Sequence, residues 1–387
     1  MAMLLKSKRV YIANGFREAC IRIEGGRITD ILPCCDAYTT DSDVELYDFG
    51  NKRVLPGFID IHTHGAYGVD TNDASEEGLK KWARCITEEG VTSFLPTASV
   101  DKKEVLLRTA ASVASVMKSN YEGAEILGLH LEGPYLDSSH RGAQPSGACV
   151  SPSVDEFKEF QKAAEGNIRY ISLAPEHDIG FELTKYCSTH GVTVAMGHSG
   201  ADFETAVMAA ANGAASVTHV YNAMSPFMHR APGLVGAALR IKDLYGEIIC
   251  DCIHNSPDAV SIFFNAKGEG RGIMVTDSLS IKKADGSKQL MFCGKKLISD
   301  KNGLAYLEDG TIAGSTLSMN EGLRNLVERC GVSVDRAIDS CTANPARCIG
   351  AADRKGRIAY GFDADIVVLD DDYTVLRTYC KGCQKST

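Results

Sequence analysis

The chain has 387 residues, of which 44% are hydrophobic and 24% are charged, and it carries a formal net charge of −9. This composition is ordinary for a globular protein and excludes disorder over most of the length. The acidic balance disfavours nucleic acids and anionic membranes as partners, and we recognise neither a long apolar run nor a secretory leader, so we expect a cytoplasmic protein that acts on a small molecule.

Both ends of the chain contain short segments in which apolar and polar residues alternate, as in half-buried strands. We expect strands at residues 9–12, 19–23, 27–32, 44–48, 366–369 and 373–379. Gly25 and Gly26 mark a hairpin between two of them. Two β-rich ends around one long middle predict a small β-sandwich domain assembled from residues 1–54 and 356–387.

In the middle of the chain, short apolar runs alternate with longer helical stretches, which is the pattern of βαβ units. Strands are expected at residues 55–62, 92–96, 126–131, 168–174, 192–197, 215–219, 248–253 and 273–276. Helices are expected at residues 76–89, 102–117, 154–164, 180–190, 202–212, 257–265, 320–330 and 334–343. This α/β pattern favours a (β/α)₈ TIM barrel over residues 55–355, with a doubly wound open sheet as the alternative. Residues 280–309 look like an insertion with a hairpin at Asp285 and Gly286.

Polar residues stand where the strands of such a barrel would end. His62 and His64 end the first run, and the third, fifth, sixth, seventh and eighth runs lead to Glu132, His198, His219, His254 and Asp277. Five of the ten histidines in the chain therefore fall at strand ends. Because barrel enzymes place catalysis at the carboxyl ends of their strands, we expect these side chains to share one site.

The residue types at these positions predict a hydrolytic metal site. Imidazole and carboxylate ligands suit zinc or iron(II), either of which activates water near neutral pH. His62 and His64 are two residues apart, so on a strand they project from the same face and can reach one metal. Glu132 could bridge to a second position completed by His198 and His219, so we expect one or two divalent metals. A single histidine at a strand end is usually an ordinary polar residue, and the prediction depends on the whole set.

Two further residues suggest what the site acts on. Asp277 could take a proton from water and pass one to a leaving nitrogen, which an amide substrate requires because an unprotonated amine leaves poorly. Arg230 lies in a loop rich in proline and glycine, where a guanidinium can bind a phosphate through two hydrogen bonds. A solvated loop charge is the alternative reading of Arg230.

Several motifs resemble a known family. Residues 54–64 (VLPGFIDIHTH) and 361–370 (GFDADIVVLD) resemble the amidohydrolase superfamily. More narrowly, the chain resembles the N-acetylglucosamine-6-phosphate deacetylase family at residues 131–134, 197–199, 218–226, 229–233 and 313–317. The stretch from 218 to 233 is the most specific, since general amidohydrolases lack it. The resemblance implies a metal-dependent hydrolase that converts N-acetyl-D-glucosamine 6-phosphate to D-glucosamine 6-phosphate and acetate in amino-sugar catabolism.

The resemblance also implies roles for individual residues. Glu132, His198 and His219 match the main metal ligands, and His62 and His64 match a pair found in members that hold two metals. Asp277 matches the catalytic acid/base. The positions that match substrate contacts are Ala143, Gln144, Asn222, Ala223, Arg230, His254, Ile312, Ala313 and Gly314. Family members are typically homodimers with substrate sites near the subunit interface.

The sequence departs from some relatives at Gln144, which stands where they carry a histidine that contacts the substrate carbonyl. Glutamine can donate a hydrogen bond there, but it cannot carry a proton.

Three alternatives remain open at this point. An epimeric substrate, N-acetylgalactosamine 6-phosphate, would fit the same residues. Dihydroorotase-like and deaminase-like relatives often use a carbamylated lysine at a strand end, but Glu132 occupies that place here. A non-catalytic metal-binding or sugar-phosphate-sensing protein would not need Asp277 beside a complete ligand set.

The single CxxC pair, Cys380 and Cys383, predicts no zinc site because a second pair is missing.

Overall fold

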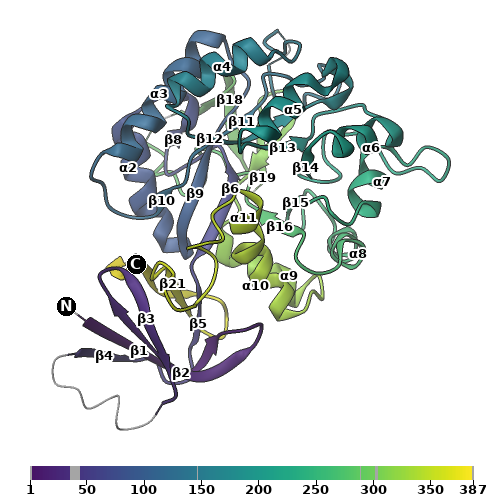
Figure 1. Ribbon diagram of the computed structural model, residues 1–387. Helices are drawn as coiled ribbons and strands as arrows, with labels where there is room; N and C mark the ends of the chain where they lie inside the picture. Colours follow the sequence, from purple (N-terminus) through teal and green to yellow (C-terminus); the bar gives the residue numbers. More distant parts are fainter. Residues whose placement is uncertain (1, 35–43, 146, 288, 301–303, 386–387) are drawn as a thin grey trace.

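The computed structural model describes residues 2–34, 44–145, 147–287, 289–300 and 304–385. Figure 1 shows two parts, a large α/β barrel and a small sheet that holds both ends of the chain. In the described part of the chain, no helix is both long and apolar enough to cross a membrane.

Parallel strands form the barrel wall. They are β6 (Phe58–Thr63), β9 (Val91–Ala98), β11 (Leu129–Glu132), β12 (Ile168–Leu173), β13 (Thr193–Met196), β14 (Ala214–Val217), β15 (Gly246–Ile249) and β16 (Gly272–Val275). Pairing runs from β6 through β9, β11, β12 and β13 to β14, and β15 pairs with β16. Backbone hydrogen bonds from Val217 N to Tyr245 O (3.1 Å) and from Asp277 N to His62 O (2.9 Å) join the remaining edges. The predicted barrel is thereby confirmed over the open sheet.

Helices cover the outside of this barrel (Figure 1). They are α2 (Glu76–Cys85), α3 (Lys103–Lys118), α4 (Val154–Ala163), α5 (Glu182–Thr189), α6 (Phe203–Ala211), α7 (Gly233–Arg240), α8 (Pro257–Lys267), α9 (Met319–Glu328), α10 (Val334–Cys341) and α11 (Ala343–Cys348). Helices α2 and α8 begin where predicted and α6 begins one residue later, because Ser75, Ser256 and Asp202 accept hydrogen bonds from backbone N–H groups of the first turn. The sequence did not predict α7, whose eight residues include two glycines and so lack a strong helical signal.

The two ends of the chain form the small sheet. Its strands are β1 (Ala2–Tyr11), β2 (Phe16–Glu24), β3 (Arg27–Leu32), β4 (Val44–Asp48), β5 (Arg53–Pro56), β21 (Ile366–Leu369), β22 (Val375–Cys380) and β23 (Cys383–Lys385). Pairing is continuous from β23 through β22, β21, β5, β1 and β2 to β3, with β4 beside β1. Along β21, Ile366 and Val368 face a core of the small sheet, whereas Val367 and Leu369 pack into the barrel core. The strand predicted at residues 366–369 is therefore present, and because both of its faces are buried it packs against both parts.

The strand expected at residues 55–62 is divided in two. Gly57 separates β5, which pairs with β21 in the small sheet, from β6, which pairs with β9 in the barrel. A Cβ atom at Gly57 would lie 2.2 Å from the Thr92 side chain, so a larger residue would clash where the chain crosses between the sheets. The adjacent Pro56 and Gly57 are a local signal for this break, which the prediction of one strand over residues 55–62 overlooked.

The expected insertion is present, but its strands lie later than predicted. In the described residues it contains β17 (Met291–Phe292), β18 (Lys295–Ser299), β19 (Leu304–Leu307) and β20 (Ile312–Ser315), paired antiparallel. Asp285 and Gly286 precede this sheet and do not form the tip of a hairpin. A bridge between Ser278 and Ser315 returns β20 to the barrel, just beyond the end of β16.

Candidate active site

The residues predicted at the strand ends come together at one end of the barrel. Glu132 is the last residue of β11, and His198, His219 and Asp277 each lie two residues beyond a strand. These last three residues have positive φ angles of 48°, 23° and 48°. Left-handed backbone is unusual outside glycine, and where it clusters at a site it is a sign of a functional constraint on the side chains.

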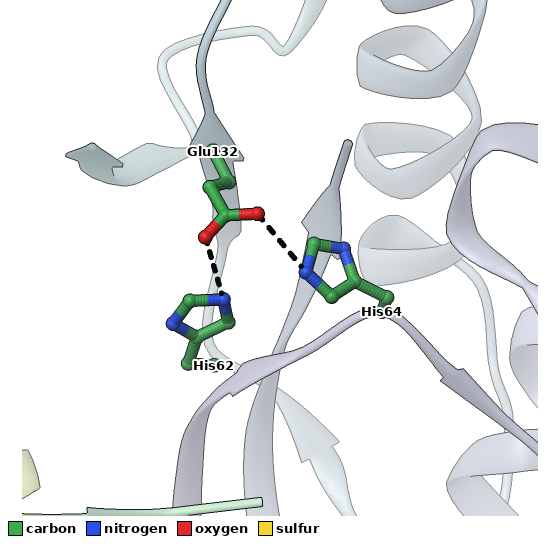
Figure 2. Close-up of side chains that lie close together, drawn as sticks. All are labelled: His62, His64 and Glu132. Atoms are coloured by element: carbon green, nitrogen blue, oxygen red, sulfur yellow. Dashed lines mark ion pairs between the residues drawn. The ribbon is translucent and has the colours of Figure 1, made fainter. Parts of the chain in front are cut away.

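Glu132 lies at the centre of the cluster. Its Oε1 atom is 3.1 Å from Nε2 of both His198 and His219, and 3.2 Å from Nε2 of His62. Its Oε2 atom is 3.2 Å from Nε2 of His64. Figure 2 shows the two carboxylate oxygens directed at His62 and His64. All five residues are at most 5% exposed.

Hydrogen bonds at the other ring nitrogen hold three of the four imidazoles in this orientation. His198 Nδ1 lies 2.9 Å from the carbonyl oxygen of His140, His64 Nδ1 lies 2.8 Å from Ser99 Oγ, and His62 Nδ1 lies 2.7 Å from Glu247 Oε2. Such partners fix the tautomer and leave Nε2 as a free ligand atom.

The donor set fits a divalent metal. His62, His64 and Glu132 form one group of converging ligand atoms, and Glu132, His198 and His219 form another. His62 Nε2 is fully buried without a hydrogen-bond partner among the described residues. A buried polar atom without a partner is costly, and a bound cation would satisfy it.

The charges of the cluster also favour a cation. Burial by itself would lower the pKa of His62, but the carboxylates of Glu132, Glu247 and Asp277 raise it well above its ordinary value. Burial likewise opposes ionisation of Glu132, yet the surrounding histidines hold the pKa of that carboxyl well below its usual range. Positive charge is therefore stabilised between these side chains, which fits a site able to hold a metal cation.

Asp277 lies beside the His62 and His64 half of the cluster. Its Oδ1 atom is 3.3 Å from His64 Nε2 and 3.5 Å from His62 Nε2. Gly314 of β20 packs against its backbone: a Cβ atom there would lie 2.6 Å from Asp277 O, and the φ of +49° also favours glycine. The insertion can therefore approach the strand end closely enough to form one wall of the cavity.

The structure brings most of the predicted substrate residues into this cavity. Its lining includes Ala143, Gln144, Asn222, Ala223, His254, Ile312 and Gly314, together with His64, Glu132, His198, His219 and Asp277. Ala313 is buried in the core of the insertion instead. Arg230 is exposed on a loop outside the lining.

His254 reaches the cavity from a loop. The strand expected at residues 248–253 is β15, which ends at Ile249, so His254 lies five residues past it. Its Nδ1 atom is 2.6 Å from Asp251 Oδ2. Burial would lower the pKa of His254, but the hydrogen bond and charge of Asp251 raise it above its ordinary value. Asp251 therefore stabilises the cationic form of this imidazole, which suits an anionic ligand.

Sequence reasoning missed several residues of the site. Phe292 and Leu279 line the cavity from the insertion, and the Phe292 ring lies 5.8 Å from the His64 ring. Glu247 is fully buried behind His62. Its only signal in the sequence is a carboxylate inside the apolar strand β15, with no indication of its partner.

Comparisons with known proteins agree with this geometry. A model of the amidohydrolase family matches residues 53–384. The chain is 40% identical over 333 residues to N-acetylglucosamine-6-phosphate deacetylase of Bacillus subtilis (strain 168), covering 85% of this chain and 83% of that protein. It is 34% identical over 372 residues to the Homo sapiens protein of the same name, covering 93% and 90%.

Solved structures give the same result. N-acetylglucosamine-6-phosphate deacetylase from Pasteurella multocida superposes with a TM-score of 0.92 at 29% identity, covering 100% of both chains. A mutant of the Mycobacterium smegmatis deacetylase in complex with N-acetyl-D-glucosamine-6-phosphate also has a TM-score of 0.92, at 27% identity, and covers 100% of both chains.

Proposed function

Because the chain belongs to the amidohydrolase family and, within it, to the N-acetylglucosamine-6-phosphate deacetylases, we propose that its cavity hydrolyses the acetamide of N-acetyl-D-glucosamine 6-phosphate. The products are acetate and D-glucosamine 6-phosphate. The observation that carries this proposal is the convergence of five ligand-type side chains, four of which line one cavity together with Asp277.

We assign the metal to Glu132, His198 and His219, with a second position at His62 and His64. Nitrogen and carboxylate donors suit zinc or iron(II). A divalent metal bound there would lower the pKa of a coordinated water and polarise the carbonyl of the substrate.

The remaining chemistry belongs to side chains of the cavity. Asp277 accepts a proton from the attacking water and returns one to the nitrogen as the tetrahedral intermediate collapses, so that an amine leaves instead of an amide anion. Phe292 and Leu279 exclude bulk water from one side of the cavity. His254, held by Asp251, supplies a cationic donor for the phosphate.

The function is tested by acetate release from N-acetylglucosamine 6-phosphate, with the unphosphorylated sugar and N-acetylgalactosamine 6-phosphate in parallel. We expect the first substrate to have the highest kcat/KM, because removing the phosphate leaves His254 without its partner. Equal rates with the unphosphorylated sugar would contradict the phosphate subsite. Faster release from the galactosamine epimer would replace the substrate assignment but keep the reaction.

We further propose that the protein is a homodimer in which Arg230 reaches the substrate of the partner subunit. Arg230 is exposed outside the cavity of its own chain, on a loop where Phe227 and Met228 are 59% and 56% exposed. Backbone hydrogen bonds between Met228 and Ala231 in both directions hold the loop in a defined turn. Large exposed apolar side chains next to a cation are typical of an interface.

Mixed dimers test this arrangement. Arg230→Ala and Asp277→Asn subunits are each expected to be nearly inactive alone. When they are mixed and allowed to exchange subunits, a site with Asp277 from one chain and Arg230 from the other is complete, so activity is expected to return. No recovery in a mixture shown to contain mixed dimers would place Arg230 in the site of its own chain. A monomer in sedimentation analysis would contradict the dimer.

A further inference from the structure

Glu247 stands out among the groups that the proposed mechanism does not use. It lies on β15 and is 0% exposed, at the bottom of the metal cluster. A carboxylate removed from water is costly unless it is paired, so its presence inside the barrel calls for a role.

The contacts of Glu247 lead to two metal ligands. Its Oε2 atom is 2.7 Å from His62 Nδ1, and the backbone N–H of His219 donates to the same oxygen at 3.4 Å. A further backbone hydrogen bond, from Val220 N to Glu247 O at 2.8 Å, ties β15 to the segment that carries His219. Glu247 therefore connects the first strand of the barrel with the loop after β14.

The support of His62 differs from that of the neighbouring ligands. The Nδ1 atoms of His64 and His198 have a hydroxyl or a backbone carbonyl as partners, whereas that of His62 has a carboxylate. A charged acceptor forms a stronger hydrogen bond and makes the imidazole a better ligand at its other nitrogen.

His62 has little other polar support. The His130 ring packs edge-on against it, with ring centroids 4.6 Å apart, but both nitrogens of His130 are occupied by Thr97 Oγ1 (3.1 Å) and Ser172 Oγ (2.9 Å). His130 therefore restricts the position of the His62 ring without selecting its tautomer. Glu247 is the group that directs Nε2 of His62 toward Glu132.

We propose that Glu247 is a positioning residue for His62 and thereby sustains metal binding at the His62–His64 half of the centre. This inference rests on the metal centre of the proposed function. It distinguishes the two halves, because Glu247 meets the ring nitrogen of His62 at 2.7 Å, whereas in the other half it contacts only the backbone N–H of His219 at 3.4 Å. Loss of Glu247 should weaken one metal position and leave the other.

The test is a titration of metal-free protein with Zn²⁺ against a chromophoric chelator. Wild-type protein should bind two equivalents per subunit. Glu247→Gln should bind the first within about threefold of wild type and the second about 10–100-fold more weakly, the range found for such supporting residues. His62→Ala should show the same selective loss. The visible spectrum of the Co²⁺-loaded protein should change in Glu247→Gln to resemble that of His62→Ala.

Glu89 offers a matched control. It is also a fully buried carboxylate, paired with Lys282 Nζ at 2.9 Å and Tyr67 Oη at 3.0 Å, but it contacts none of the proposed metal ligands. Glu89→Gln makes the same chemical change at the same burial, so it should keep both zinc equivalents even if stability falls.

Specific outcomes overturn the proposal. One is a second equivalent that binds Glu247→Gln as tightly as wild type, and another is a wild-type protein that binds a single equivalent. Equal weakening of both equivalents also overturns it, because it would indicate a general structural role. If Glu247→Gln does not fold, NMR spectra of wild-type protein labelled with ¹⁵N-histidine test the contact instead. They should contain a downfield signal from the His62 Nδ1 proton, and this signal should be missing in His62→Ala. A wild-type spectrum without the signal would refute the contact between His62 and Glu247. If the protein does not release acetate, the proposed reaction is rejected, but the zinc titration and the histidine spectra still test the role of Glu247.

Discussion

Asp277→Asn is expected to lower kcat by about three orders of magnitude while KM and metal content stay close to wild type, since positioned proton transfer contributes roughly 10²–10⁴-fold. Asparagine has nearly the same shape, so the left-handed backbone at this position and the hydrogen bond from Asp277 N to His62 O can persist. The amide cannot accept the proton of the attacking water or return it to the leaving nitrogen. Single-turnover kinetics and metal analysis of the purified variant measure both quantities.

The role of Asp277 is tested by comparing the loss of kcat with the metal content of the same variant. If the variant also loses metal, Asp277 acts mainly as a ligand, as its 3.3 Å distance from His64 Nε2 would permit. Activity within tenfold of wild type would refute the proton-transfer role altogether. Faster turnover by Asp277→Asn with an activated leaving group, such as a substrate whose amine is a weak base, would support it, because protonation of the nitrogen then matters less.

Glu132→Gln is expected to lose both metal and activity, to below about 1% of wild-type kcat/KM under metal-limited conditions. Oε1 lies beside Nε2 of His62, His198 and His219, and Oε2 lies beside Nε2 of His64, so one substitution weakens both positions. An amide offers one oxygen ligand and no charge, and the hydrogen bond from Gln144 Nε2 to Glu132 Oε2 (2.5 Å) would be lost where nitrogen replaces that oxygen.

Metal per subunit after dialysis, with circular dichroism as the check on folding, measures this effect. Glu159→Gln is the control, because Glu159 is an exposed residue of α4 paired with Lys103 at the surface, and such pairs contribute little. Retention of two tightly bound metals by Glu132→Gln would contradict the bridging role. Loss of only one would restrict Glu132 to one half of the centre.

The strand-end residues could be predicted from sequence because of a property of the fold. In a parallel barrel every carboxyl end arrives at the same rim, so the order of apolar runs is enough to bring His62, Glu132, His198 and Asp277 together without knowing any distance. The position of a helix start could be predicted for a similar reason, since a cap such as Ser75 acts within three residues of itself.

Other parts of the site could not be predicted in this way. Phe292 enters the cavity because the insertion folds back through β20, which depends on the close packing of Gly314 against Asp277 O. Arg230 was expected beside the phosphate, yet its exposure depends on how one short loop turns between Met228 and Ala231. The sequence around Phe292 and around Arg230 does not indicate where either side chain lies relative to the cavity.

The sequence by itself determined the barrel, the set of side chains at its rim and the class of chemistry, because backbone period and residue type are local properties. Tertiary structure decided which atoms meet. Glu247 shows the difference: the sequence places a carboxylate in an apolar strand, but its contact with His62, 185 residues away, exists only because the barrel closes and both side chains point inward. Contacts across a closed sheet depend on register and curvature, and those are set by the packing of the whole chain.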